Sequence, residues 1–180
     1  MTENVDLFIS CEGQVLSGDD ISLLKAQMAA YGIACDAECH PLHIWASLDI
    51  FAPVMRIITS PAFAEGVFAG LLSAMMWDGI KAAVRYIRDK FVTATHYTPS
   101  NSKHEPNIQI NIGPNRLVIP MSLENDLIEK AMDEFYASVQ EHPAGQDYYY
   151  TLDPTHKRLF YRTYDEIIRD EIAEHESKGK

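Results

Sequence analysis

Apolar positions change their spacing along the chain, and these changes predict the order of the secondary-structure elements. Residues 5–11 form a short apolar run with β-branched members and are expected to be a buried strand. The next apolar positions follow helical spacing until Tyr31 and Gly32, after which residues 33–40 alternate between apolar and polar. A strand, a helix and a strand in this order predict a crossover unit with two parallel strands.

The most apolar stretch of the chain, residues 63–77, carries a single charge, Glu65. Ser60 and the proline after it suit the cap and the first position of a helix. We therefore expect a long central helix over residues 60–92, buried on all sides in its first half. An unbroken helix of this length would be longer than a domain of this size usually spans. We therefore expect either a kink near residues 77–79 or a helix whose exposed length meets a second subunit.

Small residues recur every four positions within this stretch. Gly66 and Gly70, together with Ala62 and Ala74, line one face of the expected helix and would let another backbone approach closely. This face fits either internal packing on the sheet or a dimer seam, and both interpretations stay open. The uncharged run is shorter than the roughly 20 apolar residues that a bilayer requires, so a membrane span is not expected.

Two segments have weaker patterns. Residues 47–58 are predicted to form a shorter helix with Pro53 in its first turn. Residues 93–106 are polar, contain two prolines and show no periodicity. Loops of this length are unusual inside a compact domain, so we expect a polar loop or a subdomain seam at 93–106. No composition shift divides the chain further, and a single domain of residues 1–180 is predicted.

The second half of the chain alternates between hairpins and helices. Residues 108–112 and 116–119, separated by a Gly-Pro-Asn turn, predict an antiparallel hairpin. Residues 148–152 and 158–161 predict a second one. An amphipathic helix capped by Ser122 is expected between the two hairpins, and a charged helix is expected after the second.

These elements together predict an α+β fold with two layers. We expect a mixed β-sheet, built from one βαβ unit and two β-hairpins. A long buried central helix and further amphipathic helices are expected to pack on this sheet. The hydrophobic content of the 180 residues, 47%, is enough for one sizeable core.

Charge narrows the choice of partners. The chain has 26 acidic and 15 basic residues and a formal net charge of -11. Phosphate binding needs a basic surface, so nucleic acid is not expected as a ligand, whereas a basic protein would be attracted. The N-terminus lacks the basic start and apolar core of a secretory signal, and three cysteines cannot form a closed disulfide framework. We expect a cytoplasmic location.

Cysteine and histidine gather near the end of the second expected strand. Cys35, Cys39, His40 and His43 carry the ligand atoms that zinc prefers, and Cys11 ends the neighbouring strand. Cys11, Cys39 and His40 are therefore the candidate catalytic residues. The candidate metal ligands are Cys35, Cys39, His40 and His43. The spacing matches no recurring zinc pattern. Cys35 and Cys39 also fit a simple role as small apolar residues on the buried face of a strand.

Two further groups of side chains are candidates for binding. Tyrosine is enriched at protein interfaces, and the C-terminal third is rich in it. The candidate interaction residues are Tyr148, Tyr149, Tyr150, Tyr161 and Tyr164. Lys81, Arg85 and Arg88 form a basic strip that could hold an anion or simply face solvent, with Arg85 paired to Asp89.

Three functional hypotheses follow. The first is a small acidic cytosolic interaction protein, an inhibitor or immunity-type partner of a basic protein. The second is a small enzyme or metal-binding protein that uses the Cys/His cluster. The third is a membrane-docked protein that exposes the helix of residues 63–77. No phosphate-binding glycine loop, G-x-S-x-G elbow or H-E-x-x-H helix is present, which favours a non-enzyme, and no cofactor is predicted.

Overall fold

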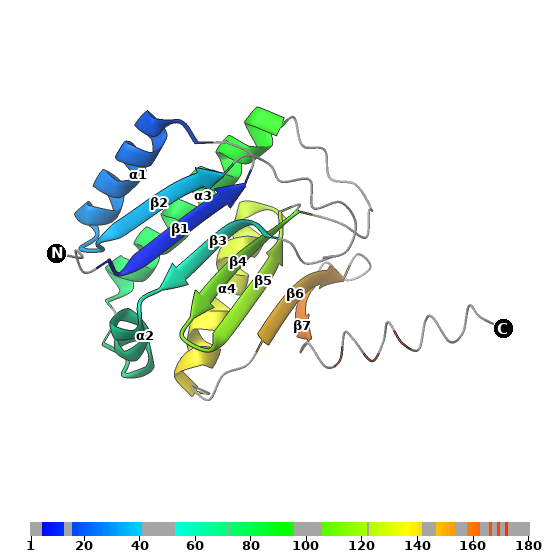
Figure 1. Ribbon diagram of the computed structural model, residues 1–180. Helices are drawn as coiled ribbons and strands as arrows, with labels where there is room; N and C mark the ends of the chain where they lie inside the picture. Colours follow the sequence, from blue (N-terminus) through cyan, green and yellow to red (C-terminus); the bar gives the residue numbers. More distant parts are fainter. Residues whose placement is uncertain are drawn as a thin grey trace.

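Seven strands form one mixed sheet, and the helices lie on one of its faces (Figure 1). This computed structural model describes residues 5–12, 16–40, 53–71, 73–95, 106–121, 123–141, 147–153 and 158–162, with residues 166, 169 and 172. The described elements are β1 (Leu7–Glu12), α1 (Gly18–Ala30), β2 (Cys35–His40), β3 (Pro53–Thr59), α2 (Pro61–Phe68), α3 (Ala74–Thr95), β4 (Asn107–Ile112), β5 (Asn115–Pro120), α4 (Asn125–Glu141), β6 (Asp147–Asp153) and β7 (Arg158–Arg162).

The strand order is β2-β1-β3-β4-β5-β6-β7. Three neighbouring pairs are parallel, β1 with β2, β3 with β4 and β5 with β6, and each pair is joined through helices. The other neighbours, including the hairpins β4–β5 and β6–β7, are antiparallel. The predicted α+β class, the βαβ unit and both hairpins are confirmed. The sheet also contains two parallel crossovers that the sequence analysis did not anticipate.

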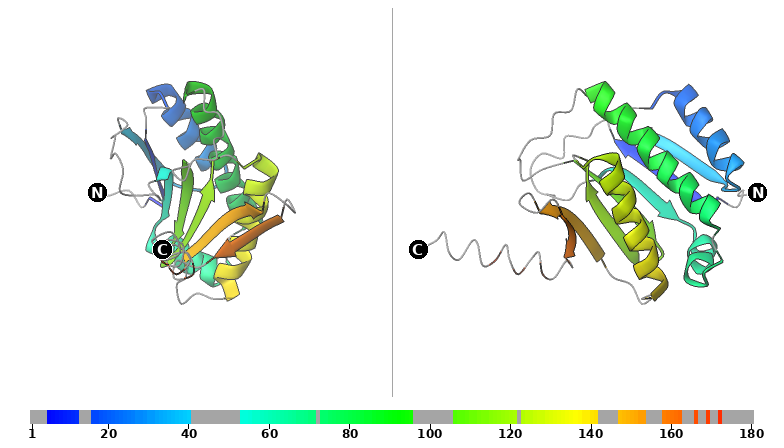
Figure 2. Two further views of the ribbon diagram at one scale, coloured as in Figure 1. Left: turned by 90° about the vertical axis from the view of Figure 1, so that its right-hand side faces the viewer. Right: turned by 180° about the vertical axis from the view of Figure 1, so that it is seen from behind.

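The helical layer and the sheet enclose a continuous core. Seen from behind, α1, α3 and α4 run across the sheet side by side (Figure 2). On β1, Leu7, Ile9 and Cys11 are fully buried. They pair in register with Cys35, Ala37 and Cys39 of β2. The opposite face of the sheet carries none of the described helices, so the fold has two layers (Figure 1).

Strand β3 corrects the prediction of a helix over residues 47–58. Met55, Ile57 and Thr59 are buried, whereas Arg56 and Ile58 between them are exposed, which is the two-residue period of a strand. β3 is an inner strand between β1 and β4, so pairing on both sides determines its structure. Residues 47–52 of the predicted helix lie outside the described residues.

The long central helix expected over residues 60–92 is two helices, α2 and α3. α2 ends in a Schellman motif in which the Gly70 N–H donates to the Val67 carbonyl at 3.0 Å and the Leu71 N–H donates to the Gly66 carbonyl at 2.8 Å. Gly70 has φ +67°, a conformation that glycine adopts without strain. The break therefore lies at residues 69–73, and the kink expected at residues 77–79 is absent because α3 continues through them.

Burial within this stretch also differs from the expectation. Phe63, Val67 and Trp77 face the core, but Leu71 and Met75 are exposed. A Cβ atom on Gly66 or Gly70 would meet nothing within 4 Å among the described residues. Close internal packing of a small-residue face is therefore not what the structure shows. The alternative interpretation, a dimer seam, stays a prediction.

The close approach occurs instead at Gly79, which is buried where α3 crosses the end of α1. A Cβ atom there would lie 2.7 Å from Cγ of Tyr31. This atom is near the root of the tyrosine side chain, so the backbone of one helix would have to shift. The overpacking should cost about 1–3 kcal/mol and outweigh the roughly 1 kcal/mol gained from helix propensity. Gly79→Ala is therefore expected to lower the free energy of unfolding by up to about 2 kcal/mol.

The matched control for this change is Gly66→Ala in α2, which has open space around the new methyl group. This variant should raise the free energy of unfolding by about 0.5–1 kcal/mol. Urea denaturation followed by circular dichroism measures both changes. Equal effects of the two substitutions would contradict the tight α1–α3 contact.

Candidate functional site

The predicted Cys/His cluster is divided between the two faces of β2. Cys11 and Cys39 are register partners at the ends of β1 and β2, as expected, and Cys39 packs against the core. His40 follows in the strand and points to the other face. There its Nε2 atom lies 2.7 Å from Oε1 of Glu38. His43 lies outside the described residues. The described geometry therefore does not bring thiol and imidazole ligands together.

The thiol of Cys35 is poorly suited to nucleophilic or metal chemistry. Burial, with a smaller contribution from the neighbouring Asp36 carboxylate, raises the pKa of Cys35 to about 11, so the thiol is protonated at neutral pH. Its Sγ atom lies 3.5 Å from the Asp36 carbonyl oxygen. Among the described residues, no group of three or more His, Cys, Asp or Glu side chains is placed to hold a metal ion.

The basic strip of α3 is neutralised by carboxylates of neighbouring elements. Lys81 lies 2.9 Å from Asp78 and 3.1 Å from Asp133 of α4. Burial lowers the pKa of Lys81, but its hydrogen bonds to these two carboxylates outweigh that effect and raise the pKa overall. Arg85 pairs with Glu129 of α4, not with Asp89 as predicted. The strip therefore links α3 to α4, and its charges are not left over for an anion.

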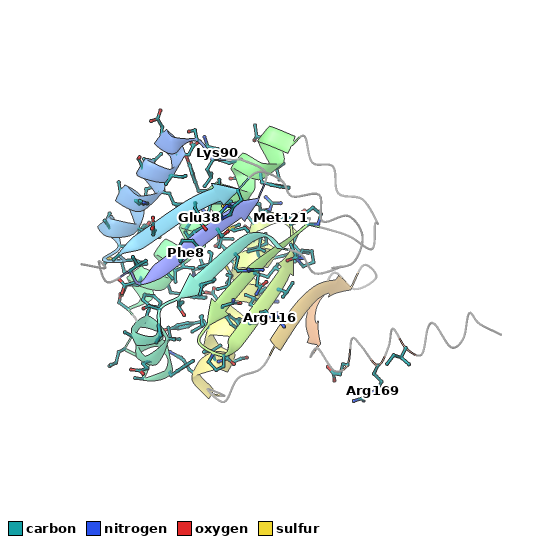
Figure 3. All side chains as sticks on the ribbon, in the orientation of Figure 1. Phe8, Glu38, Lys90, Arg116, Met121 and Arg169 are labelled. Carbon is teal, nitrogen blue, oxygen red and sulfur yellow. The ribbon has the colours of Figure 1, made fainter. Side chains whose placement is uncertain are left out.

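The N-terminus of α1 is tied to α3 by a similar network. The carboxylate of Asp20 accepts hydrogen bonds from Tyr86 Oη at 2.6 Å and from the Ser17 backbone N–H at 2.9 Å. Nζ of Lys90 lies 2.7 Å from Oδ1 of Asp20. Figure 3 labels Lys90 near α1. The bonds from Lys90 and Tyr86 hold the pKa of Asp20 well below its usual value, and the Asp20 carboxylate in turn raises the pKa of Lys90. The network therefore holds α1 against α3. It also moves the pKa values of Asp20, Tyr86 and Lys90 further from neutrality.

Because these cations are used between elements, the helical layer has a surplus of exposed carboxylates. Five acidic side chains on or beside α1, α2 and α4 are exposed and have no basic side chain within ion-pair distance among the described residues. They are Asp19, Glu65, Glu124, Asp126 and Glu134. With the exposed Lys130 of α4 set against these five carboxylates, part of the net negative charge lies on the surface of α1, α2 and α4.

The connection between α2 and α3 exposes apolar side chains. We call residues 69–75 the α2–α3 turn, of which residue 72 is not described. The side chain of Leu71 is 79% exposed and that of Met75 is 54% exposed. Ala69, Gly70 and Ala74 are exposed as well. The sequence analysis placed this segment in the core, although a glycine followed three residues later by a capping serine could have indicated a helix end and a new start.

The tyrosines of the C-terminal third lie partly in confirmed strands. Tyr148, Tyr149 and Tyr150 belong to β6, and Tyr161 belongs to β7, where it pairs in register with Tyr150. The structure describes the backbone of these strands only, and Tyr164 lies outside the described residues. Their role in binding stays a prediction.

Comparisons with protein-family models, curated proteins and solved structures give no significant match. Across the part of the chain that the structure describes, no helix combines the length and apolar character needed to cross a bilayer. The functional argument therefore depends on the surface charges and the exposed apolar turn described above.

Proposed function

We propose that the protein is an acidic interaction protein, an inhibitor or immunity-type partner of a basic protein. The observation that carries this proposal is the surplus of exposed carboxylates on the helical layer. The basic residues of α3 are paired with Asp20, Asp78, Asp89, Glu129 and Asp133, so they do not offset the remaining acidic groups.

An acidic surface of this kind favours association with a positively charged surface. Complementary charge raises the association rate and penalises partners of like charge. The same carboxylates would repel nucleic acid, in agreement with the composition. A cytoplasmic location is part of this proposal.

A pull-down from a lysate of the source cells tests it. The immobilised protein should retain a specific basic partner at low salt and lose it as salt rises, because exposed charges are screened. The matched control replaces Asp19, Glu65, Glu124, Asp126 and Glu134 by their amides, which changes the net charge from -11 to -6. This variant should lose the partner at low salt while keeping the helical circular dichroism spectrum. No specific partner at any salt concentration would contradict the proposal.

The other two hypotheses have less support. The Cys/His enzyme or metal site keeps Cys11 and Cys39 adjacent but separates them from His40. The membrane-docked alternative gains one observation, the exposure of Leu71 and Met75 within residues 63–77. Exposed carboxylates on α2 and α3, Glu65 and Asp78, disfavour an anionic lipid surface.

A further inference from the structure

Hydrogen bonds fix the backbone on each side of the α2–α3 turn. The two Schellman hydrogen bonds fix the chain at Gly70 and Leu71. On the other side, Ser73 caps α3, because its Oγ atom accepts the Met76 N–H at 3.2 Å and its carbonyl accepts the Trp77 N–H at 3.2 Å. Leu71 and Met75 therefore lie at hydrogen-bonded ends of two helices.

The local sequence leaves Leu71 without an internal contact of the usual kind. In a Schellman motif the residue at the position of Leu71 commonly packs on the side chain three or four helical positions before the cap. The C-cap of α2 is Ala69, and the residue three positions before it is Gly66, which has no side chain for Leu71 to contact. The result is a leucine that is 79% exposed although its backbone is held by hydrogen bonds. An exposed apolar side chain of this size on a hydrogen-bonded backbone suits docking, since less backbone freedom is lost on binding.

Carboxylates flank the turn on both helices. Glu65 is exposed on α2, and Asp78 is exposed on α3 three residues after Met75. Asp133 of α4, 54% exposed, lies beyond Asp78, and Lys81 between them is only 17% exposed. Because Lys81 pairs with both Asp78 and Asp133, these three groups and Glu65 together leave a net charge of -2 on the helices beside the turn.

We infer that the α2–α3 turn inserts Leu71 and Met75 into an apolar pocket with a basic rim on a protein partner. The inference rests on the proposed function for the class of partner and adds the surface that binds it. Charge complementarity selects this occupant. Lys81 offsets only one of the charges of Glu65, Asp78 and Asp133, so the remaining negative charge would repel an anionic lipid surface and disfavours a second copy of the same acidic chain.

Substitution at the turn provides the first test. Leu71→Ser removes an exposed apolar side chain and should leave the fold intact, but it should weaken capture of the basic partner by roughly 10- to 100-fold. The control is Leu23→Ser on α1, where the leucine is 48% exposed and distant from the turn in sequence. This control should retain the partner. If the unaltered protein captures a partner that Leu71→Ser also retains, the inference is wrong and the proposed function stands. If the unaltered protein captures none, the proposed function fails first.

Photo-crosslinking identifies the occupant directly. Benzoyl-phenylalanine at position 71, compared with the same group at position 23, should give a protein adduct in the source cells that is specific to position 71. The crosslinked peptide should contain apolar residues next to lysine or arginine. Glu65→Gln combined with Asp78→Asn should reduce the yield. A lipid adduct, binding of the protein to phosphatidylcholine vesicles, an adduct of twice the chain mass, or equal labelling at both positions would each overturn the inference.

Discussion

Trp77→Ala is expected to lower the free energy of unfolding by about 3–5 kcal/mol, because this side chain joins α3 to α4. Trp77 is 4% exposed and stacks on Tyr136 with ring centroids 4.7 Å apart. Its Nε1–H donates to Oδ1 of Asp133 at 2.9 Å. The substitution removes the ring from the core and takes one hydrogen-bond donor from Asp133. Urea denaturation followed by far-ultraviolet circular dichroism measures the change.

Two variants separate the causes. Trp77→Phe keeps an aromatic ring but loses the hydrogen bond, so its effect should be clearly smaller than that of Trp77→Ala. Met75→Ala, two residues earlier in the same helix, removes a side chain that is 54% exposed and should change stability by less than about 0.5 kcal/mol. A cost below about 1 kcal/mol for Trp77→Ala would show that α3 and α4 do not pack as described.

The elements that could be predicted from sequence are those whose local signals agree with their final neighbours. At the start of α1, Ser17 and Asp20 form a complete capping box, and the apolar spacing that follows matches the burial of Leu24 and Met28. The β4–β5 hairpin is similar, since Ile108, Ile110 and Ile112 alternate and all are buried. In these segments the hydrophobic period, the turn residues and the tertiary packing indicate the same structure.

β3 was missed because its period is ambiguous over so few residues. Met55, Ile57 and Ile58 can be placed on a helix as well as on a strand, and the buried Thr59 does not identify either. Pairing with β1 and β4 decides the structure, and that pairing joins residues far apart in the chain. Missing β3 also hid the second crossover of the sheet.

The α2–α3 turn was missed for a different reason. Gly70 and Ser73 are local signals of a helix end and a helix start, but Gly70 was assigned to a small-residue face that recurs every four positions. Once one helix was assumed, Leu71 and Met75 had to be interior. The ion pairs could not have been predicted, because Arg85 meets Glu129 of α4 only after α3 and α4 have packed.

Arg88→Ala is expected to lower the free energy of unfolding by about 2–4 kcal/mol, because one guanidinium group holds the segment between β5 and α4. Nη2 donates to the Leu123 carbonyl at 2.7 Å, Nε donates to the Met121 carbonyl at 3.3 Å, and Nη1 donates to Oδ1 of Asn125 at 3.2 Å. Met121 and Leu123 are buried, so their carbonyl groups would lose a donor in a place where water has little access.

The comparison with Arg85→Ala makes this prediction specific. Arg85 is 53% exposed and pairs only with Glu129 among the described residues, so its removal should cost less than about 1 kcal/mol. Arg88→Lys keeps the charge, but a single ammonium group cannot reach three acceptors as the planar guanidinium does. Its stability cost should therefore fall between those of the two alanine variants.

Hydrogen exchange adds a local measurement. In Arg88→Ala the amides of Met121 and Leu123, which donate to the carbonyls of Pro106 and Pro120, should exchange faster, whereas those of β1 should change only as much as global stability does. Equal costs for Arg85→Ala and Arg88→Ala would mean that charge alone, and not the three-acceptor arrangement, determines the contribution of Arg88.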